Sequence, residues 1–379
     1  MNKPPQTQLL FLLRSLNYGG AERQVVALAT SLRQKGESVA IATLYSAGPW
    51  RKNLEAAGVP LYTLGKHWRW DLFFVFRLIK LVRETRPAIL HGCLGIANIL
   101  TVLLHPLLPN VRIVWGVRAS DMDLRRYGWL DRLLYRLECA LSRFADLIIA
   151  NSYTGLNYAV AHGFPKEKMV VISNGIDTDE FLPDPDLRKN VRGNLGVTEN
   201  DRLIGLVGRL DPMKDHPTFL KAAALLTRER TDVRFLCVGD GPQPYQSRLR
   251  LMSEELGLGK RLIWLSSAKD MSAIYNAMDV MTLASSYGEG FSNAIGEAMA
   301  CGVPCVVSDV GDSKWIVGET GWVIPPGNPT ALCAGWRQML ELDADARIEQ
   351  GKKARIRIVH HFGLERLIVE TWDALKSIE

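Results

Sequence analysis

Glu289 and Glu297, eight residues apart near the end of the chain, are the residues best suited to binding chemistry. Ser292 between them is a favourable residue to cap the start of a helix, and Gly302 is a favourable helix stop. We therefore expect Glu289 in the loop ahead of a helix and Glu297 about one turn inside that helix. A helix start offers free N–H groups to an anion, and carboxylates beside it accept hydrogen bonds from hydroxyls. The spacing fits an anionic ligand with many hydroxyls; the alternative is a solvated helix face.

Two other short sequences contain residues that could bind phosphate. Gly19 and Gly20 lie between the first expected strand and the first expected helix, where a ligand could approach the backbone closely. Arg209 and Lys214 follow the first expected strand of the second half. A guanidinium and an ammonium on one loop could hold a diphosphate and stabilise its charge as it leaves. The plainer interpretations are a tight turn for the glycines and ordinary surface cations for the pair.

Apolar strand-like runs alternate with helical patterns along both halves of the chain. Such alternation is typical of parallel sheets covered by helices on both faces. In the first half we expect strands at 9–13, 39–44, 88–91, 112–117, 147–150 and 170–172, with a helix at 21–34. In the second half we expect strands at 203–207, 234–238, 262–265, 280–284, 305–308 and 322–324. The helices expected there are 215–230, 244–256, 271–277, 293–301 and 330–342, and the last 35 or so residues read as helical throughout.

The best linker candidate is 173–185, which is rich in turn residues and contains two prolines. The sequence therefore predicts an α/β protein with two doubly wound domains, at 1–172 and 173–358, and a terminal helix at 359–379. Ligands of such sheets bind outside the carboxyl ends of the strands, so we expect a ligand cleft between the domains.

Taken together, these motifs resemble those of a known enzyme family. Gly288-Glu-Gly-Phe-Ser292, Cys301-Gly-Val-Pro-Cys305, Gly19-Gly-Ala-Glu22 and the Arg209/Lys214 pair resemble, in order and spacing, motifs of the retaining glycosyltransferases of family 4. The resemblance runs from Gly19 to the helix after Cys305 and implies the GT-B fold, in which the final helix crosses back to the first domain. It also implies transfer of a sugar from a nucleotide diphosphate sugar, expected to be UDP-linked, to a saccharide acceptor with retained configuration.

The resemblance assigns roles to individual residues. It implies that Glu297 binds the ribose hydroxyls, that Glu289 holds the sugar hydroxyls, and that Arg209 and Lys214 stabilise the leaving diphosphate. The full expected donor set is Gly19, Gly20, Arg209, Lys214, Ser266, Glu289, Gly290, Phe291, Ser292, Asn293 and Glu297, of which Arg209, Lys214 and Glu289 are expected to be catalytic. Because no side chain stands out as a nucleophile, we expect the leaving phosphate oxygen to take the acceptor proton on the same face.

The first half departs from the family pattern at one position. Arg118 stands where many relatives have a histidine, and arginine stays protonated, so it cannot act as a general base. We expect Arg118 to bind donor phosphate or an anionic acceptor. His91, at the end of an earlier strand, is a second candidate on the acceptor side; the alternative is a core histidine with satisfied hydrogen bonds.

No metal or cofactor is expected. Metal-dependent transferases use Asp-x-Asp pairs to hold a divalent cation on the diphosphate. Four such pairs occur, mostly in linker-like or helical surface sequence: 121/123, 177/179, 184/186 and 343/345. This distribution favours solubility over metal binding, so we expect Arg209 and Lys214 to replace the ion.

The net charge of +6 favours an anionic partner. No nucleic-acid-binding motif, signal segment or membrane span is apparent, so we expect a cytoplasmic protein that binds phosphorylated ligands or the inner membrane face. Two expected helices place basic and aromatic residues on one face: Arg69, Phe73, Phe76, Arg77, Lys80 and Arg83, then Arg125, Trp129, Arg132 and Arg136. The opposite, core faces would carry Leu72, Val75, Ile79 and Val82, then Leu130, Leu134, Leu137 and Leu141. These faces predict contact with anionic lipid, or simply cations lying over packed helices.

The sequence thus predicts a metal-independent hexosyl- or N-acetylhexosaminyltransferase. A lipid-linked acceptor in cell-surface polysaccharide or O-antigen assembly fits the basic helices. Two alternatives stay open: a nucleotide-sugar 2-epimerase of the same fold, and a sugar-binding protein without catalysis.

Overall fold

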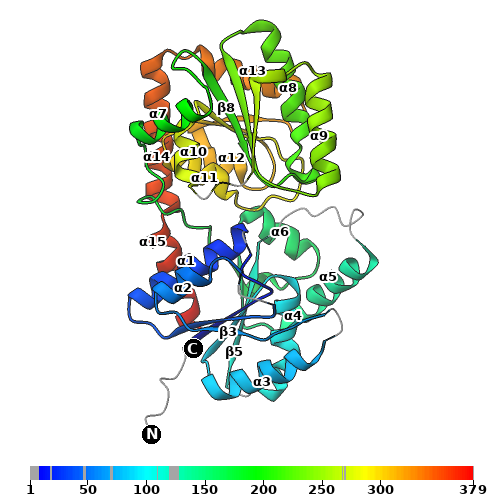
Figure 1. Cartoon of the computed structure of the whole chain (residues 1–379). Coiled ribbons are helices and arrows are strands. Elements are labelled where there is room, and N and C mark those ends of the chain that lie inside the picture. Colours follow the sequence, from blue (N-terminus) through cyan, green and yellow to red (C-terminus); the bar gives the residue numbers. More distant parts are fainter. Residues whose placement is uncertain are drawn as a thin grey trace. The chain divides into compact units, whose positions relative to one another are not determined.

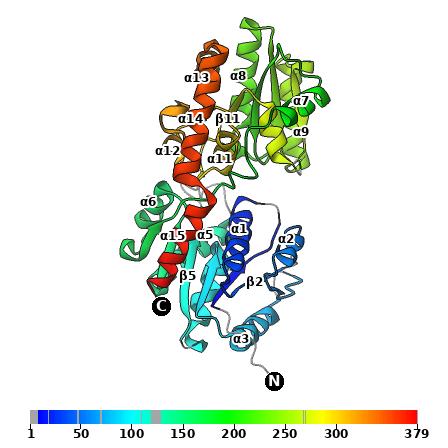
Figure 2. The same cartoon turned by 90° about the vertical axis from the view of Figure 1, so that its left-hand side faces the viewer.

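The computed structural model describes residues 8–17, 19–45, 48–68, 71–108, 110–118, 128–266, 268 and 270–378. The chain forms two compact units, one containing the residues up to Gly175 together with those from Leu364 onward, and the other Ile176–Gly363. Each unit is built on its own parallel sheet with helices on both faces (Figures 1 and 2). The expected class, two doubly wound α/β domains, is confirmed.

The sheet of the first unit has seven parallel strands in the order β3-β2-β1-β4-β5-β6-β7. The strands are β1 (Leu9–Leu13), β2 (Val39–Thr43), β3 (Leu61–Thr63), β4 (Ile89–Cys93), β5 (Arg112–Val117), β6 (Leu147–Ala150) and β7 (Met169–Val171). Every residue of β1 is buried, because helices cover both faces of a parallel sheet. β3 was not expected from the sequence: it is a three-residue edge strand with no buried residue and therefore carries no apolar run.

Helices pack on both faces of this sheet. They are α1 (Gly20–Gln34), α2 (Arg51–Ala56), α3 (Phe73–Thr85), α4 (Gly95–Leu104), α5 (Trp129–Leu141), α6 (Tyr153–Ala161) and α15 (Leu364–Lys376), with short 3-10 helices at His105–Leu107, Ser142–Phe144 and Lys166–Lys168. One core contains residues of α3, α4 and α6, such as Leu78, Leu100 and Ala159. The other contains residues of α1 and α15, such as Leu28 and Trp372. The final helix therefore packs in the first unit, as expected.

The second unit has six parallel strands in the order β10-β9-β8-β11-β12-β13. They are β8 (Arg202–Val207), β9 (Val233–Val238), β10 (Leu262–Leu265), β11 (Val280–Leu283), β12 (Cys305–Ser308) and β13 (Trp322–Ile324), each within one residue of its expected ends. The helices are α7 (Pro185–Asn194), α8 (His216–Glu229), α9 (Gln243–Glu255), α10 (Met271–Ala277), α11 (Asn293–Ala300), α12 (Ser313–Val317), α13 (Pro329–Glu341) and α14 (Ala344–Phe362), with 3-10 helices η5 (Pro212–Lys214), Gly259–Arg261 and Gly318–Thr320. One core contains residues of α10, α11 and α14, and the other contains residues of α8, α9 and α13.

The chain passes between the units twice, and glycines mark both passages. Gly363 separates α14 from α15, so the last residues are two helices, where the sequence suggested unbroken helix. The N–H of Ile176 donates to the carbonyl oxygen of Phe362 at 2.8 Å. A Cβ on Gly175 would lie 2.8 Å from the Cα of Leu364. Gly175 also exchanges two hydrogen bonds with the amide of Gln24, at 2.8 and 2.9 Å, which fixes its backbone on α1.

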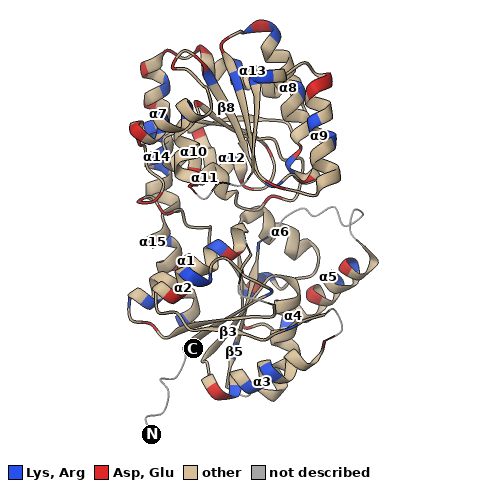
Figure 3. Cartoon of the chain, viewed as in Figure 1, with Lys and Arg blue, Asp and Glu red and all other residues tan. Residues whose placement is uncertain are grey.

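Helices α3 and α5 carry several charged residues (Figure 3). Both helices also expose large apolar residues. On α3, Phe73 and Phe76 are exposed, as are Arg77, Lys80 and Arg83, in agreement with the expected face. The expected core stripe was wrong in part, since Leu72 precedes the helix and is exposed. Val82 is buried as expected, and Val75 and Ile79 are half-buried. The other buried residues are Phe74, Leu78 and Leu81, a spacing that matches one helix face.

Helix α5 has no buried residue. Trp129, Leu133 and Leu137 are 75%, 53% and 38% exposed. The expectation that Leu137 lies on a core face was therefore wrong. Arg69 and Arg125 lie outside the described residues. Within the described ranges, no helix is long and apolar enough to cross a membrane.

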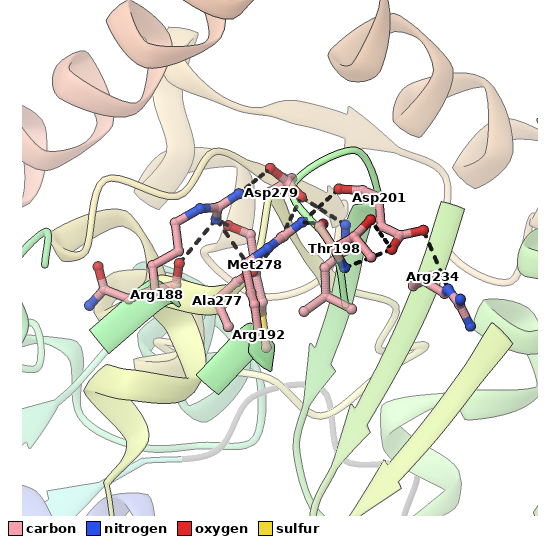
Figure 4. Close-up of polar contacts among 10 residues, drawn as sticks. Arg188, Arg192, Thr198, Asp201, Arg234, Ala277, Met278 and Asp279 are labelled. Atoms are coloured by element: carbon pink, nitrogen blue, oxygen red, sulfur yellow. Dashed lines mark hydrogen bonds and ion pairs between the residues drawn. The ribbon is translucent and has the colours of Figure 1, made fainter. Parts of the chain in front are cut away.

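A buried charge network ties α7 to the amino end of β11 (Figure 4). Arg192, 1% exposed, donates to Oδ2 of Asp279 at 3.1 Å and to the carbonyl oxygens of Thr198 and Asp201 at 2.6 and 2.7 Å. Arg188 bonds the other Asp279 oxygen at 2.8 Å. Buried charges persist when they are paired and hydrogen-bonded, as these are. This network lies at the amino end of β11. It therefore stabilises the sheet at the end opposite the loops that follow β8 and β11.

Candidate active site

In the second unit, the sequence motifs converge where the strand order reverses. β8 and β11 are neighbours, and the order runs outward from them in both directions. Loops at the carboxyl ends of two such strands leave room for a ligand, which makes this position the usual binding site of doubly wound sheets. The loop after β8 carries Arg209 and Lys214, and the loop after β11 carries Glu289.

Lys214 and Glu289 form a buried ion pair. Nζ of Lys214 lies 2.5 Å from Oε1 of Glu289, and the two side chains are 15% and 7% exposed. The hydroxyl of Ser285 donates to the same oxygen at 2.5 Å. Among the described residues, no hydrogen bond reaches the other oxygen, Oε2. One carboxylate oxygen is thus held by two donors, and the other is left to accept hydrogen bonds from a ligand.

Capping interactions fix the loop that carries Lys214. Asp211 accepts a hydrogen bond from the N–H of Met213 at 2.9 Å and so starts η5. Asp215 has a left-handed backbone, with φ of 46°, and its carboxylate caps α8 by accepting from the N–H of Thr218 at 3.2 Å. The hydroxyl of Thr218 donates to the other carboxylate oxygen at 2.7 Å. This capping offsets the cost of the unusual backbone. Lys214 is therefore held between a capped turn and a capped helix.

The loops after β8 and β11 also contact each other directly. The N–H of Ser286 donates to the carbonyl oxygen of Met213 at 2.9 Å. Gly288 has φ of 76°, and a Cβ there would lie 2.6 Å from the sulfur of Met213. Glycine is required at this position both by its backbone and by the close approach of Met213.

Arg209 lies on the same loop but is exposed. Within the part of the chain that the structure describes, its guanidinium forms no hydrogen bond or ion pair. The turn at Gly239–Gly241 fixes the backbone of this loop, since the N–H of Leu210 donates to the carbonyl oxygen of Asp240 at 2.9 Å. Arg209 is therefore a cation on a supported backbone, available to an anionic ligand.

His216 is a neighbour of Lys214 that the sequence reasoning missed. It is fully buried at the start of α8, and neither ring nitrogen has a partner among the described residues. Burial, with a further contribution from the charge of Lys214, lowers the pKa of His216 to about 4. The imidazole is therefore neutral at physiological pH and adds no positive charge beside the lysine.

Glu297 lies inside α11, as expected, and is buried. The hydroxyl of Tyr275, on α10, donates to Oε2 of Glu297 at 2.9 Å. Tyr275 is 1% exposed, so this bond is shielded from water. No local sequence pattern singles out Tyr275, because only the packing of α10 against α11 brings the two residues together.

Residues 290–293 lead into α11. Ser292 occupies the cap position, but its side chain makes no capping hydrogen bond, contrary to expectation. The carbonyl oxygen of Gly290 accepts from the N–H of Asp312 at 3.2 Å. The ring of Phe291 packs on Phe362, with centroids 5.3 Å apart, and Asn293 is the first residue of the helix. Packing therefore fixes this backbone and leaves the Ser292 hydroxyl free of the capping role.

Ser266 stands apart from this group. It is exposed and follows β10, two strands away from β8. Neighbouring strands are about 4.8 Å apart, so β10 runs roughly 10 Å from β8.

The acidic pairs considered for metal binding serve other purposes where the structure describes them. Asp177 accepts hydrogen bonds from the N–H groups of the next turn, and Asp184 and Asp343 cap α7 and α14. Asp121 and Asp123 lie outside the described residues. Among the described residues, no group of three or more His, Cys, Asp or Glu could hold a metal ion.

In the first unit, the glycine motif also follows a strand at a reversal of order. β1 and β4 are neighbours there; Gly19 and Gly20 follow β1, and His91 lies on β4. Gly19 caps α1, and a Cβ on it would lie 2.2 Å from a carboxylate oxygen of Glu22. The Glu22 carboxylate thus folds over the first turn of α1, where the helix dipole favours negative charge.

Arg118 follows β5 and donates to Oδ1 of Asn174 at 2.7 Å. The pKa of Arg118 is lowered, mainly because the side chain is buried, while nearby Cys93 and Glu22 act in the opposite direction. His91 is buried, with both ring nitrogens lacking a partner among the described residues. Burial and, second, the charge of Arg118 lower the pKa of His91 to about 3. His91 is thus a neutral core histidine. It differs from the alternative interpretation, a core histidine with satisfied hydrogen bonds, because its ring nitrogens lack partners among the described residues.

Comparisons with known proteins agree with these features. Residues 18–180 match the family model described as Glycosyltransferase Family 4, and residues 201–342 match that described as Glycosyl transferases group 1. The chain therefore belongs to the group 1, family 4 glycosyltransferases.

Among characterised proteins, the chain is similar to the D-inositol 3-phosphate glycosyltransferases of Corynebacterium glutamicum and Mycobacterium bovis. Identity is 29% over 220 residues, covering 55% of this chain and 52% of the relative, and 31% over 218 residues, covering 54% and 45%. The matched part thus spans about half the length of these relatives.

The fold resembles that of the Anabaena protein Alr3699/HepE, solved in complex with UDP-glucose. The TM-score is 0.87 at 23% identity, covering 98% of this chain and 99% of that protein. At this identity the likeness shows the fold, which is of the GT-B type in agreement with the expectation.

Proposed function

We propose that the protein transfers a sugar from a UDP-linked donor to a saccharide acceptor with retention of configuration. The observation that carries the proposal is the buried Lys214–Glu289 pair, with the exposed guanidinium of Arg209 on the same loop as Lys214, at the carboxyl ends of β8 and β11. A diphosphate and a polyhydroxylated sugar are the two ligand parts that such a cation–carboxylate set matches.

Binding of the donor would replace the contact between Lys214 and Glu289 with contacts from each of them to the donor. Lys214 passes from Glu289 to the diphosphate, where Arg209 joins it. Glu289, released on one side, accepts hydrogen bonds from sugar hydroxyls, together with the backbone of Gly290–Asn293. Glu297, already oriented by Tyr275, accepts from the ribose hydroxyls. The choice of UDP is supported by the Anabaena protein of the same fold that was solved with UDP-glucose.

The chemistry then belongs largely to the substrates. The bond between the anomeric carbon and the phosphate oxygen breaks, and its electron pair goes to the diphosphate. The acceptor oxygen bonds the anomeric carbon on the same face, and its proton passes to the departing phosphate oxygen. Arg209 and Lys214 stabilise the charge that grows on the diphosphate, a role that a divalent ion has in other transferases.

The first unit would bind the acceptor. Arg118 is a cation fixed by Asn174, and it suits an anionic group such as the phosphate of a lipid-linked saccharide. Gly19 and Gly20 would let the donor phosphates or the acceptor approach the α1 backbone. Exposed Phe73, Phe76 and Trp129 among basic residues favour contact with an anionic membrane, where such an acceptor resides. This combination supports a role in cell-surface polysaccharide or O-antigen assembly.

The test uses the full chain with a panel of nucleotide sugars. Thermal stabilisation identifies the donor, and release of UDP is then followed with and without a membrane lipid extract. We expect one UDP-sugar to stabilise the protein, and UDP release to require the extract. Conversion of the donor to its epimer without any acceptor would identify an epimerase. Donor binding with no UDP release under any acceptor would indicate a binding protein.

A further inference from the structure

Ser285 contacts the same Glu289 oxygen as Lys214 does, but it lies on the loop after β11 that also carries Glu289. Its hydroxyl donates to Oε1 at 2.5 Å, and Ser285 is fully buried. Resting on the proposed function, we infer that Ser285 is a positioning residue for the donor sugar: it orients the Glu289 carboxylate so that Oε2 faces the sugar hydroxyls after Lys214 has moved to the diphosphate.

Ser285 is itself held in place from both sides. Its carbonyl oxygen accepts a hydrogen bond from the hydroxyl of Ser308 at 2.6 Å, and Ser308 is the last residue of β12. The next N–H, that of Ser286, donates to Met213 in η5 at 2.9 Å. The backbone of Ser285 is therefore fixed by β11, β12 and η5, and this backbone directs the Ser285 hydroxyl toward Glu289.

The need for such a residue follows from the shared use of Lys214. When the ammonium bonds the diphosphate, it can no longer hold Oε1 with its full charge. The terminal torsion of glutamate is broad, so an unheld carboxylate rotates easily and can follow the lysine. Ser285 is then the remaining side-chain donor on Oε1 among the described residues. Ser285 therefore allows Lys214 to move to the diphosphate while the Glu289 carboxylate keeps its orientation toward the sugar.

The second glutamate offers a matched comparison. Tyr275 donates to Glu297 as Ser285 donates to Glu289, but Glu297 is assigned to the nucleotide. Loss of the Tyr275 hydroxyl should weaken the nucleotide and the nucleotide sugar equally. Loss of the Ser285 hydroxyl should weaken only the part of the affinity that the sugar contributes.

The test compares Ser285→Ala and Ser285→Cys with Tyr275→Phe in the full chain. Cysteine retains the buried volume but is a weak donor, so it serves if alanine destabilises the fold. Dissociation constants are measured by calorimetry for UDP and for the UDP-sugar that binds the wild type. Removing a hydrogen bond to a charged group should weaken UDP-sugar binding about tenfold in the Ser285 variants and leave UDP binding within about twofold. Tyr275→Phe should weaken both ligands by a similar factor.

A double-mutant cycle with Glu289→Ala, which removes the acceptor of the Ser285 hydrogen bond, separates a role through Glu289 from a general structural role. In that background, Ser285→Ala should have almost no further effect on sugar affinity or on kcat. Equal weakening of UDP and UDP-sugar by the Ser285 variants, or unchanged binding of both, would overturn the inference. A wild type that binds no nucleotide sugar would instead overturn the proposed function, so the two failures are distinguishable.

Discussion

Nζ of Lys214 lies 2.5 Å from Oε1 of Glu289, although the residues are 75 positions apart in the chain. The pair joins the loop after β8 to the loop after β11, the two strands at which the sheet order reverses. Both side chains are largely buried, so their charges stabilise each other until a ligand replaces one of them. In the proposed function, this one contact would link the residue that binds the donor diphosphate to the residue that binds the donor sugar.

Replacing Lys214 should abolish most of the turnover. Lys214→Met removes the buried cation that we assign to the leaving diphosphate, and kcat should fall by about 10²–10³-fold. The fold should persist, because Ser285 still donates to Glu289. UDP release and a thermal melt are measured together. Lys221→Met, on the exposed side of α8, is the control and should retain activity; full activity in Lys214→Met would contradict the assigned role.

Replacing Glu297 should weaken the nucleotide itself. Glu297→Ala removes both carboxylate oxygens, including the one that accepts from the buried Tyr275 hydroxyl. The dissociation constant for UDP should rise by about tenfold or more, the usual effect of losing hydrogen bonds to a charged group. Titration calorimetry with UDP checks this, with the exposed Glu254→Ala as the control. An unchanged UDP affinity would move the ribose contact elsewhere.

The Arg192–Asp279 pair should be costly to break from one side. Arg192→Met leaves a buried carboxylate partly uncompensated and should lower the free energy of unfolding by about 3–5 kcal/mol. The exposed pair Arg366–Glu370 is the comparison, and Arg366→Met should cost roughly 0.5 kcal/mol or less. Urea unfolding of both variants measures the difference. Equal effects would mean that burial does not set the contribution of the Arg192 network.

Stability should fall at mildly acidic pH because of His91. The folded pKa of His91, about 3, lies below its ordinary value of 6.5, so the unfolded chain binds more protons between these values. The stability from burying the neutral ring is complete above pH 6.5 and is lost as the pH falls toward 3, by up to about 1.4 kcal/mol per unit. Urea unfolding at several pH values, with His91→Asn for comparison, isolates this slope. A slope unchanged in His91→Asn would assign it to other groups.

Vesicle binding should depend on the exposed aromatic residues of the first unit. Phe73→Ser with Phe76→Ser removes two exposed rings of α3 and should reduce flotation with anionic vesicles several-fold. Raising the salt concentration should reduce it further, since each surface cation contributes about 1 kcal/mol that salt screens. Ile348→Ser with Ile356→Ser, two other exposed apolar positions on α14, is the control. If both pairs behave alike, the effect is general surface apolarity and not a membrane face.

Local pattern determined a large part of the architecture. Apolar runs of strand length and helical periodicity predicted all six strands of the second unit and six of the seven in the first. Glu289 and Glu297 were correctly assigned to the loop before α11 and to its interior, because the helix boundaries depend on local residues. β3 and the exposure of Leu72 escaped prediction, since a short edge strand and a residue just outside a helix do not follow the periodic pattern.

Only the tertiary structure decided which of these residues meet. The order of parallel strands brings Lys214 to Glu289, and the packing of α10 on α11 brings Tyr275 to Glu297. Neither contact has a local signature, because periodicity reports which face of an element is buried and not which element covers it. The sequence by itself determined the two glutamates as candidates at a helix start. The fold decided that each is oriented by its own hydroxyl, Ser285 for Glu289 and Tyr275 for Glu297, and that one of them holds the lysine.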